Sequence, residues 1–448
     1  MQKRIACVLA LTVLLLCGCQ NPAVPSQKVW SAGFGMAQLS LPENTAEPLY
    51  IAGYHNGWEI TGVLDLQQVR ALWIDDGQSA MLLIAVDCVG LGSGTVKEIR
   101  QALSEFCNQT GCDSVHVVST HTHAGVDTLG LWGPIGIDGK NDDFMSGLVE
   151  GAVATAKAAY ADRSTGTLSY AVSKTEHLQE DSREPQTYDP SLYQIRFMPD
   201  NPGQNGIRLI SFAAHAEALR GDNTMVSRDY PGVVCDTVKA QTGEDAIFLP
   251  GAIGGLIMTP TLCGEPFDAV KNLRSTGFAI AEYAINTRKW KPLEATMALS
   301  HVEFETPLEN TLFLYYKFLG ILQNEVRQSI LGTYYLQTEL NVIQLGSFAM
   351  VLLPGEIFPE LVTGTGNDAD PEPLADIAVR YGLEHCMFVG LANDEIGYIV
   401  PPGDYVLDDK LPFFREAEGD HYEETNSVGY RCAEDVAEAF QRALENMN

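Results

Sequence analysis

Hydrophobic and polar positions along the chain alternate between strand-like and helix-like spacing. Residues 81–86 (MLLIAV) form a continuous apolar run, which is typical of a strand buried on both faces. Residues 96–107 space their apolar side chains at helical intervals, and residues 115–119 are again rich in β-branched side chains. This succession of strand, helix and strand predicts a βαβ unit.

The same alternation continues to the end of the chain, without repeats or a second flexible linker. It predicts strands at 167–172, 209–213, 246–249, 297–305, 338–343, 348–353 and 387–391, and helices at 143–160, 230–242, 265–286 and 433–446. Because strands and helices are mixed throughout, we expect the α/β fold class. Residues 31–448 are predicted to form one large single domain with a mixed β-sheet core flanked by helices.

The amino-terminal residues 1–18 have the layout of a secretory signal peptide, with Lys3 and Arg4 followed by a short apolar run. The run ends in Leu16-Cys17-Gly18-Cys19, which resembles a bacterial lipobox, in which the last cysteine becomes lipidated. Residues 19–30 would then form a tether from the membrane. We expect an extracytoplasmic lipoprotein anchored to a membrane through Cys19, which would be the outer membrane if the cell is Gram-negative. The alternative is an ordinary signal peptide with an incidental cysteine.

The chain is strongly acidic, with 28 lysines and arginines against 58 aspartates and glutamates, and a formal net charge of −30. A protein with this negative charge repels nucleic acids and anionic membrane surfaces. We therefore expect no nucleic-acid partner, and we expect the protein to contact the membrane only through the lipid anchor. An odd number of cysteines follows Cys19, which implies at least one free thiol. Cys107 and Cys112 flank a turn and could pair.

Polar residues gather directly after four of the predicted strands, in the segments 120–125 (THTHAG), 215–217 (HAE), 354–356 (PGE) and 393–398 (NDEIGY). The carboxyl ends of strands are where α/β proteins collect their ligands. On an extended chain His121 and His123 project to the same side, so both can face one pocket.

Histidines and one carboxylate from separate strands are the ligand set of a catalytic zinc that keeps one position open for water. Zinc lowers the pKa of that water to about 7 and prepares it to attack a carbonyl carbon. A simpler interpretation remains open for each residue. His121 and His123 could be hydrogen-bonded loop residues, Glu356 a helix-start carboxylate, and Tyr398 and Tyr422 ordinary half-buried tyrosines.

A series of short motifs occurs in one order along the chain: Gly-Tyr, an arginine-containing strand, Thr-His-Thr-His-Ala-Gly, a strand ending in histidine, Ser-x-Asp-x-x-Gly, Pro-Gly-Glu, Asn-x-x-x-x-Tyr and His-Tyr-Glu. The first four lie at 53–54 (Gly-Tyr), 69–75 (the arginine-containing strand), 120–125 (THTHAG) and 212–215 (the strand that ends in histidine). The last four lie at 227–232 (Ser-x-Asp-x-x-Gly), 354–356 (Pro-Gly-Glu), 393–398 (Asn-x-x-x-x-Tyr) and 421–423 (His-Tyr-Glu). In this order they resemble the catalytic amino-terminal domain of the neutral/alkaline, non-lysosomal ceramidase family, over residues 31–448.

The resemblance implies one Zn²⁺ per chain, held by His121, His215, Glu356 and Tyr398, with an activated water completing the shell. It further assigns catalytic roles to three residues. His123 would handle the proton for the leaving amine, Tyr422 would donate a hydrogen bond to the developing oxyanion, and Arg183 would lie near the pocket.

The function implied is that of a zinc-dependent hydrolase of an N-acyl amide, with a small amide or a ceramide-like lipid as substrate and a place in sphingolipid metabolism. Two alternatives stay open: a non-catalytic ligand-binding lipoprotein of the same fold, and a hydrolase of esters or cell-wall fragments. One position departs from the family, since Ile257 stands where a loop serine is expected. Isoleucine can neither donate a hydrogen bond nor act as a nucleophile, so we expect any step that needs the serine to be lost or reassigned.

Overall fold

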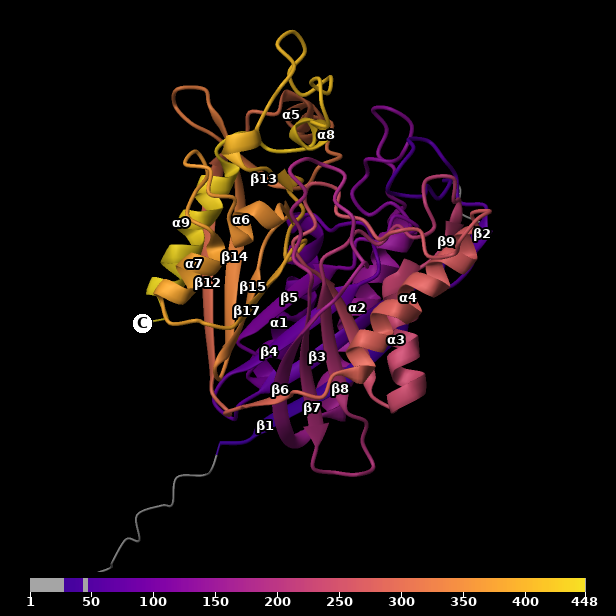
Figure 1. Cartoon of the computed structure of the whole chain (residues 1–448), viewed down its shortest axis with the longest axis vertical. Coiled ribbons are helices and arrows are strands. Elements are labelled where there is room, and N and C mark those ends of the chain that lie inside the picture. The colour runs from indigo at the N-terminus through magenta and orange to yellow at the C-terminus, as the bar shows by residue number, and fades with distance from the viewer. Residues whose placement is uncertain (1–27, 43–46, 448) are drawn as a thin grey trace, which may run out of the picture.

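The computed structural model describes residues 28–42 and 47–447 (Figure 1). The predicted signal peptide and Cys19 lie outside these residues. Throughout the part of the chain that the structure describes, no helix combines the length and the apolar character that crossing a membrane requires.

The larger sheet is mixed and lies in the indigo and magenta part of the chain (Figure 1). Strands β10–β8 and β4–β5 pair in parallel, and the other neighbours pair antiparallel. Its strand order is β10 (Asp245–Pro250), β8 (Ile207–Phe212), β7 (Ser191–Pro199), β6 (Ser164–Lys174), β1 (Trp30–Gln38), β3 (Gln68–Asp75), β4 (Ala80–Val86) and β5 (Ser114–Ser119), with β11 (Lys291–Leu293) beside β6.

A smaller sheet, coloured orange in Figure 1, packs against the first. Its order is β12 (Met297–Pro307), β14 (Tyr334–Leu345), β15 (Phe348–Leu352) and β17 (Cys386–Val389), with β13 (Glu325–Gln328) beside β14. Two short strand pairs complete the described sheets: β16 (Glu356–Ile357) with β18 (Tyr398–Ile399), and β2 (Gly62–Val63) with β9 (Met225–Val226).

The apolar side chains of β4 contribute to two hydrophobic cores, because successive side chains of a strand point to opposite faces of the sheet. Met81 and Leu83 pack into the core between the two sheets, which Phe348 of β15 also enters. Leu82 and Ile84 face the other way, toward α1 (Ser93–Thr110) and α2 (Asp142–Asp162). The strand is therefore buried on both faces, as predicted.

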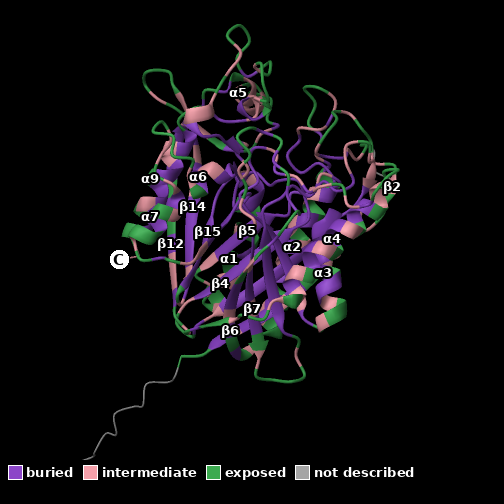
Figure 2. Cartoon of the chain, in the orientation of Figure 1, coloured by how far each residue is buried: buried purple, intermediate pink, exposed green. Residues whose placement is uncertain are grey.

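Helices cover the outer faces of both sheets, so the order of layers is helix, sheet, sheet, helix (Figure 2). The larger sheet is covered by α1, α2, α3 (Asp229–Thr242) and α4 (Ala269–Asn286). The smaller sheet is covered by α6 (Pro359–Thr363), α7 (Leu374–Arg380) and α9 (Cys432–Glu445), while α5 (Thr311–Phe318) and α8 (Tyr422–Thr425) lie in the loops at the upper end of Figure 1.

The predicted fold class, a single mixed α/β domain, is confirmed, and the mixed core proves to be two sheets. Helix α4 begins at Ala269 rather than at 265, because the side chain of Asp268 caps it by accepting a hydrogen bond from Lys271 N. Strand β1 was not predicted, since its glycines interrupt the apolar pattern. Gly33 and Gly35 lie against the backbone of α2, where a Cβ atom would collide.

The cysteines of the described residues are all free thiols. Cys107 and Cys112, whose pairing the sequence left open, are therefore not joined. Cys112 Sγ instead lies 3.2 Å from the carbonyl oxygen of Ser114.

Candidate metal centre and cavity

The four polar segments that follow strand ends meet at one place, where the two sheets join. His121 follows β5, His215 follows β8, Glu356 follows β15, and Tyr398 lies in the segment after β17. Asn393 links the sheets: it donates from its backbone N to Val117 O (2.7 Å) and accepts from Val117 N at its side-chain oxygen (2.9 Å). The edge strand of one sheet is thus hydrogen-bonded to the loop of the other.

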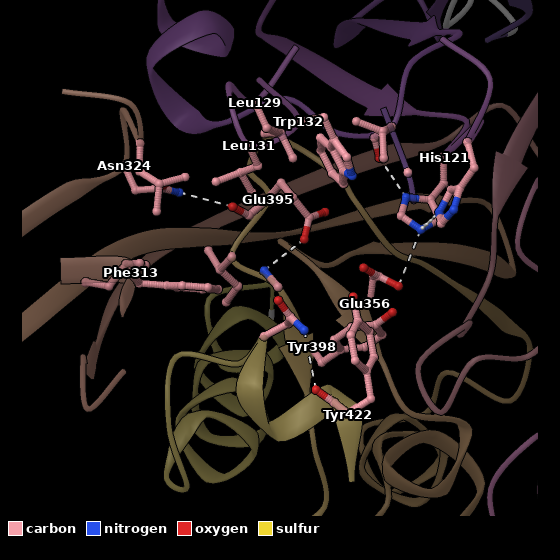
Figure 3. Close-up of a pocket in the computed structure, with 18 residues that line it drawn as sticks. His121, Leu129, Leu131, Trp132, Phe313, Asn324, Glu356, Glu395, Tyr398 and Tyr422 are labelled. Carbon is pink, nitrogen blue, oxygen red and sulfur yellow. Dashed lines mark hydrogen bonds and ion pairs between the residues drawn. The ribbon is translucent and has the colours of Figure 1, made fainter. Parts of the chain in front are cut away.

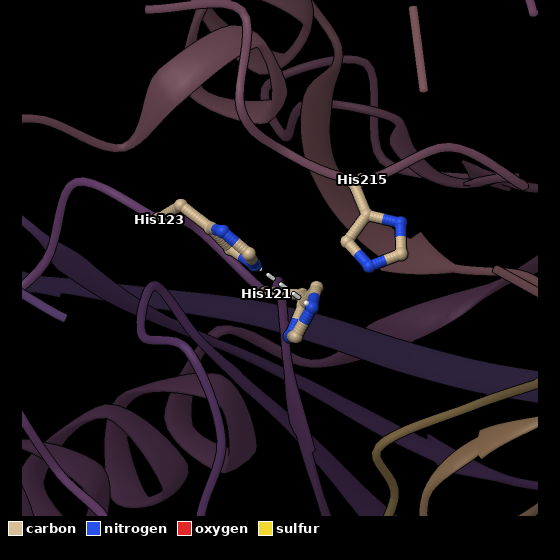
Figure 4. A group of neighbouring side chains, drawn as sticks. All are labelled: His121, His123 and His215. Atoms are coloured by element: carbon tan, nitrogen blue, oxygen red, sulfur yellow. Dashed lines mark hydrogen bonds between the residues drawn. The ribbon is translucent and has the colours of Figure 1, made fainter. Parts of the chain in front are cut away.

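His121 and His123 face the same cavity, but not because the chain is extended there. Strand β5 ends at Ser119, and His121 has a φ of 63°, in the left-handed region that non-glycine residues rarely adopt. The expectation of an extended segment is therefore wrong, but the two histidine side chains do line one cavity, as expected. The Nε2 atoms of His121 and His123 lie 3.0 Å apart (Figure 4).

Backbone carbonyls orient two of the three histidines. His121 Nδ1 donates to Val89 O at 2.6 Å, and His215 Nδ1 donates to Ile257 O at 3.0 Å. A carbonyl oxygen can only accept, so each Nδ1 carries a proton and each Nε2 is turned inward. The two Nε2 atoms lie 3.4 Å and 2.9 Å from Glu356 Oε2.

The charges of this group depend strongly on one another. Burial alone would raise the pKa of Glu356, but the charges and hydrogen bonds of His121 and His215 hold it well below the usual range. Burial would likewise lower the pKa of His215, but the hydrogen bond and charge of Glu356 raise it to about 9. Burial and then the two neighbouring rings hold the pKa of His123 far below its usual value.

Two overlapping sets of side chains could hold a metal ion. In the described residues, the ligand nitrogens of His121, His123 and His215 all lie within 4.8 Å of one another. The set expected from the family resemblance has Glu356 and Tyr398 in place of His123. Both sets share His121 and His215, the two rings that are oriented by carbonyl oxygens.

Tyr398 and Tyr422 lie beside Glu356. Tyr398 pairs directly with Glu356 across β16 and β18, is 5 % exposed, and has its ring 6.2 Å from that of Tyr422. Burial, followed by the charge of Glu356, raises the pKa of Tyr398 well above its usual value. The same causes raise the pKa of Tyr422 to about 12, so at neutral pH its hydroxyl keeps its proton and can donate it to a hydrogen bond.

His121, His123, Glu356, Tyr398 and Tyr422 line a cavity of about 110 Å³ (Figure 3). His215 lies behind Glu356 and is not among the described residues of its wall. Apart from the histidines, Glu356 and the two tyrosines, most of its wall is apolar. The apolar side chains are Val89, Leu129, Leu131, Trp132, Phe313, Leu322, Leu336 and Ile396, and the remaining polar ones are Asn324, Glu395 and Asn426.

Arg183 is not among the described residues that line this cavity. It is buried behind α8, where its guanidinium donates to Asp404 (2.8 Å), Glu423 (2.9 Å) and Glu424 (2.8 Å). Glu423 and Glu424 directly follow Tyr422 in α8. The geometry therefore makes Arg183 a candidate positioning residue for α8.

Glu217 and Tyr54 belong to the site, although no role was predicted for either from the sequence. His123 Nδ1 has no hydrogen-bond partner and lies 3.7 Å from Glu217 Oε2, while the Tyr54 hydroxyl donates to the same carboxylate oxygen. Glu217 stands two residues after His215, a spacing that could have suggested it. The carbonyl groups of Val89 and Ile257 carry no sequence signal, because every residue has one.

The chain has a mixed α/β fold of the ceramidase type, and it holds a group of histidines that could bind a metal ion. Among solved structures, the chain is similar to the neutral ceramidase from Pseudomonas aeruginosa, with a TM-score of 0.72 and 15% identity over 94% of this chain and 75% of that one. A ceramidase complexed with C2 matches with a TM-score of 0.71, at 15% identity over 93% and 75%. Comparisons with protein-family models and with curated protein sequences find no match.

Proposed function

We propose that this protein is a metal-dependent hydrolase that cleaves an N-acyl amide. The observation that carries the proposal is the convergence of His121 Nε2 and His215 Nε2 on Glu356 Oε2 at the wall of a mainly apolar cavity. The ceramidase-like fold supports it. Ligand atoms of this kind, aimed at one point from three separate strands, are suited to a catalytic zinc site.

The residues present fit a zinc ion. Each Nδ1 of His121 and His215 is held by a carbonyl oxygen, as is usual for metal-bound histidines, and Glu356 is held ionised. We assign the ion to His121, His215, Glu356 and Tyr398. When bound, zinc would polarise the substrate carbonyl and lower the pKa of water near it.

The chain's own residues supply the remaining functions. His123 lies beside His121, with 3.0 Å between their Nε2 atoms, and we assign to it the transfer of a proton to the leaving amine. The Tyr422 hydroxyl donates a hydrogen bond to the oxygen on which negative charge develops. The apolar wall binds an acyl or alkyl chain and excludes water from the reacting bond.

One observation favours a second candidate, a non-catalytic ligand-binding protein. Ile257 is fully buried and brings only its backbone carbonyl to the site, where it orients His215. No hydroxyl can therefore come from this side chain, although the family resemblance expects a serine there. In that case the cavity would hold a lipid-like ligand without cleaving it.

The metal content and hydrolytic activity of the mature protein test the proposal together. We expect about one zinc per chain and hydrolysis of fluorogenic N-acyl amides, a short-chain ceramide among them. His121→Ala and His215→Ala should lose both zinc and activity, whereas His123→Ala should keep zinc and lose activity. His301→Ala, at a half-exposed histidine outside the cluster, is the matched control.

The other possible outcomes distinguish between the two sets of metal ligands and between a hydrolase and a ligand-binding protein. Zinc retained by both His121→Ala and His215→Ala would contradict the site. Zinc lost with His123→Ala but kept in Glu356→Gln would favour the three-histidine set. Zinc bound by the wild-type protein without turnover of any amide or ester would favour the ligand-binding protein.

A further inference from the structure

A second carboxyl group, that of Glu395, lies inside the proposed substrate cavity (Figure 3). Its Oε1 accepts a hydrogen bond from Gly397 N at 2.8 Å. Its Oε2 is buried and has no hydrogen-bond partner. A buried carboxyl oxygen without a hydrogen-bond partner destabilises the fold, so its presence in a largely apolar cavity points to a ligand that donates a hydrogen bond to it.

The position of Glu395 is fixed by the residues around it. Its backbone N donates to Asp394 Oδ1 (2.9 Å), which also accepts from Ser93 N and Asn324 Nδ2, both at 2.7 Å. Asn324 Nδ2 lies within 3.2 Å of Glu395 O as well. Gly90 leaves room for the side chain, because a Cβ atom there would come within 2.9 Å of Glu395 Cγ. The carboxyl group is thus held in place before any ligand arrives.

The electrostatic surroundings of Glu395 favour a cation as that ligand. Burial, followed by the charge of Glu356, raises the pKa of Glu395 well above its usual value, so without a ligand the carboxyl group keeps its proton. A cation beside Oε2 would stabilise the ionised form of the group. The whole chain carries a formal net charge of −30, which attracts cations toward its surface. A protonated amine would donate a hydrogen bond to the unpaired Oε2 and stabilise the ionised carboxyl group.

We propose that Glu395 is a specificity-determining residue that binds a protonated primary amine of the substrate. This inference rests on the proposed hydrolase function. The substrate class that we infer is an N-acyl compound whose ammonium group is separated from the scissile amide by an apolar spacer. The spacer contacts the apolar wall, and the ammonium donates to Glu395 Oε2. The same carboxyl group would discriminate against a substrate that ends in a methyl group, because Oε2 would then stay unpaired.

Equilibrium binding tests the site without any need for turnover. Calorimetry would compare hexylamine with hexanol on the wild-type protein and on Glu395→Gln, which keeps the size and the acceptor for Gly397 N. We expect hexylamine to bind the wild-type protein about tenfold more tightly than the variant, as for a charge-assisted hydrogen bond. Glu360→Gln is the matched control, since Glu360 also has an unpaired buried Oε2 but does not line the cavity.

Hydrolysis tests the substrate class. The substrates are N-hexylhexanamide and its two derivatives with a terminal amino group on the hexyl or on the hexanoyl chain. We expect the wild-type protein to cleave one amino derivative with a kcat/KM about tenfold above that of the neutral amide. In Glu395→Gln this ratio should fall to about one, while in Glu360→Gln it should stay as in the wild-type protein.

The remaining outcomes separate this inference from the proposed function. Equal binding of hexylamine by the wild-type protein and Glu395→Gln would overturn the role of Glu395. Tighter binding of hexanol than of hexylamine would overturn the amine as the ligand and indicate a hydroxyl group. Tight hexylamine binding that depends on Glu395, without hydrolysis of any amide, would support the site and contradict the hydrolase.

Discussion

At the scale of single residues, the candidate centre depends on backbone groups as much as on side chains. His121 and His215 are oriented by the carbonyl oxygens of Val89 and Ile257, and His121 reaches the cavity through a left-handed φ of 63°. A non-glycine residue in this region is strained, and such strain is common where a side chain must be aimed at a ligand. The interaction of Ile257 with the centre therefore does not involve its side chain.

Replacing Tyr422 by Phe tests the role of its hydroxyl. If Tyr422 donates to the developing oxyanion, kcat should fall by about 10²–10³ while KM and zinc content stay near the wild-type values. Steady-state kinetics and metal analysis measure these quantities. Tyr430→Phe, at another partly exposed tyrosine, is the control. An unchanged kcat in Tyr422→Phe would remove this residue from the mechanism.

At the scale of elements, the short helix α8 is held by one arginine. Arg183 is 5 % exposed and makes ion pairs with Glu423 (2.9 Å) and Glu424 (2.8 Å), the two residues that follow Tyr422. Four residues are too few for a helix to be stable alone. The orientation of Tyr422 toward the cavity therefore depends on a contact with a segment far away in the sequence.

Replacing Arg183 by Met should remove the arginine partner of Glu423 and Glu424, and Glu424 would keep only its contacts with Val406 N and His421 Nδ1. The free energy of unfolding should fall by about 3–5 kcal/mol, the usual cost of removing one side of a buried ion pair. Denaturant titration measures the change. The matched control is Arg327→Met, at an arginine that pairs with Glu305 on the surface, where we expect little change. Equal effects of the two substitutions would mean that the Arg183 cluster adds nothing to stability.

At the scale of the whole molecule, acidic charge and buried acids make the protein sensitive to pH. Burial, opposed by hydrogen bonds, raises the pKa of Asp394 to about 7 and that of Asp229 to about 6. Burial likewise raises the pKa of Glu360 and of Glu423 to about 7. In this range the folded chain keeps protons that the unfolded chain releases, so stability falls as pH rises from about 4 to about 7.

We therefore expect the protein, with a chelator present, to have a higher free energy of unfolding at about pH 5 than at about pH 8. Denaturant titration across this range measures the slope. Asp394→Asn should make the slope shallower, because its neutral amide has no proton to lose. Asp143→Asn, at an exposed aspartate in the first turn of α2, should not change it. A stability that rises over this range would contradict the assignment.

The membrane attachment also belongs to the whole molecule and stays a prediction from the sequence. When the precursor is expressed in a bacterium, we expect the mature protein to begin at a diacylglycerol-modified Cys19 and to fractionate with membranes. Cys19→Ala should lack the modification, whereas Cys17→Ala should keep it. Mass spectrometry of the amino-terminal peptide provides the measurement. An unmodified mature amino terminus in the wild-type protein would exclude the lipid anchor.

Local patterns in the sequence were enough to predict the longer helices, many of the longer strands, the fold class, and the order of the polar segments after the strands. These features depend on the local spacing of apolar residues, which each segment carries within itself. The family resemblance added the set of side chains that meet at the cavity, including His121, His215 and Glu356. Elements that break the local pattern, such as the glycine-containing β1, could not be predicted in this way.

Four features became visible only in the three-dimensional structure: the division of the core into two sheets, the carbonyl contacts of His121 and His215, the place of Arg183 behind α8, and the unpaired carboxyl oxygen of Glu395. Each of these joins segments that are distant in the sequence; Arg183 and Glu424, for example, are 241 residues apart. A local pattern carries no information about which partner a side chain meets, because that depends on how the sheets and helices pack. The candidate chemistry was therefore visible in the sequence, and its geometry and specificity only in the fold.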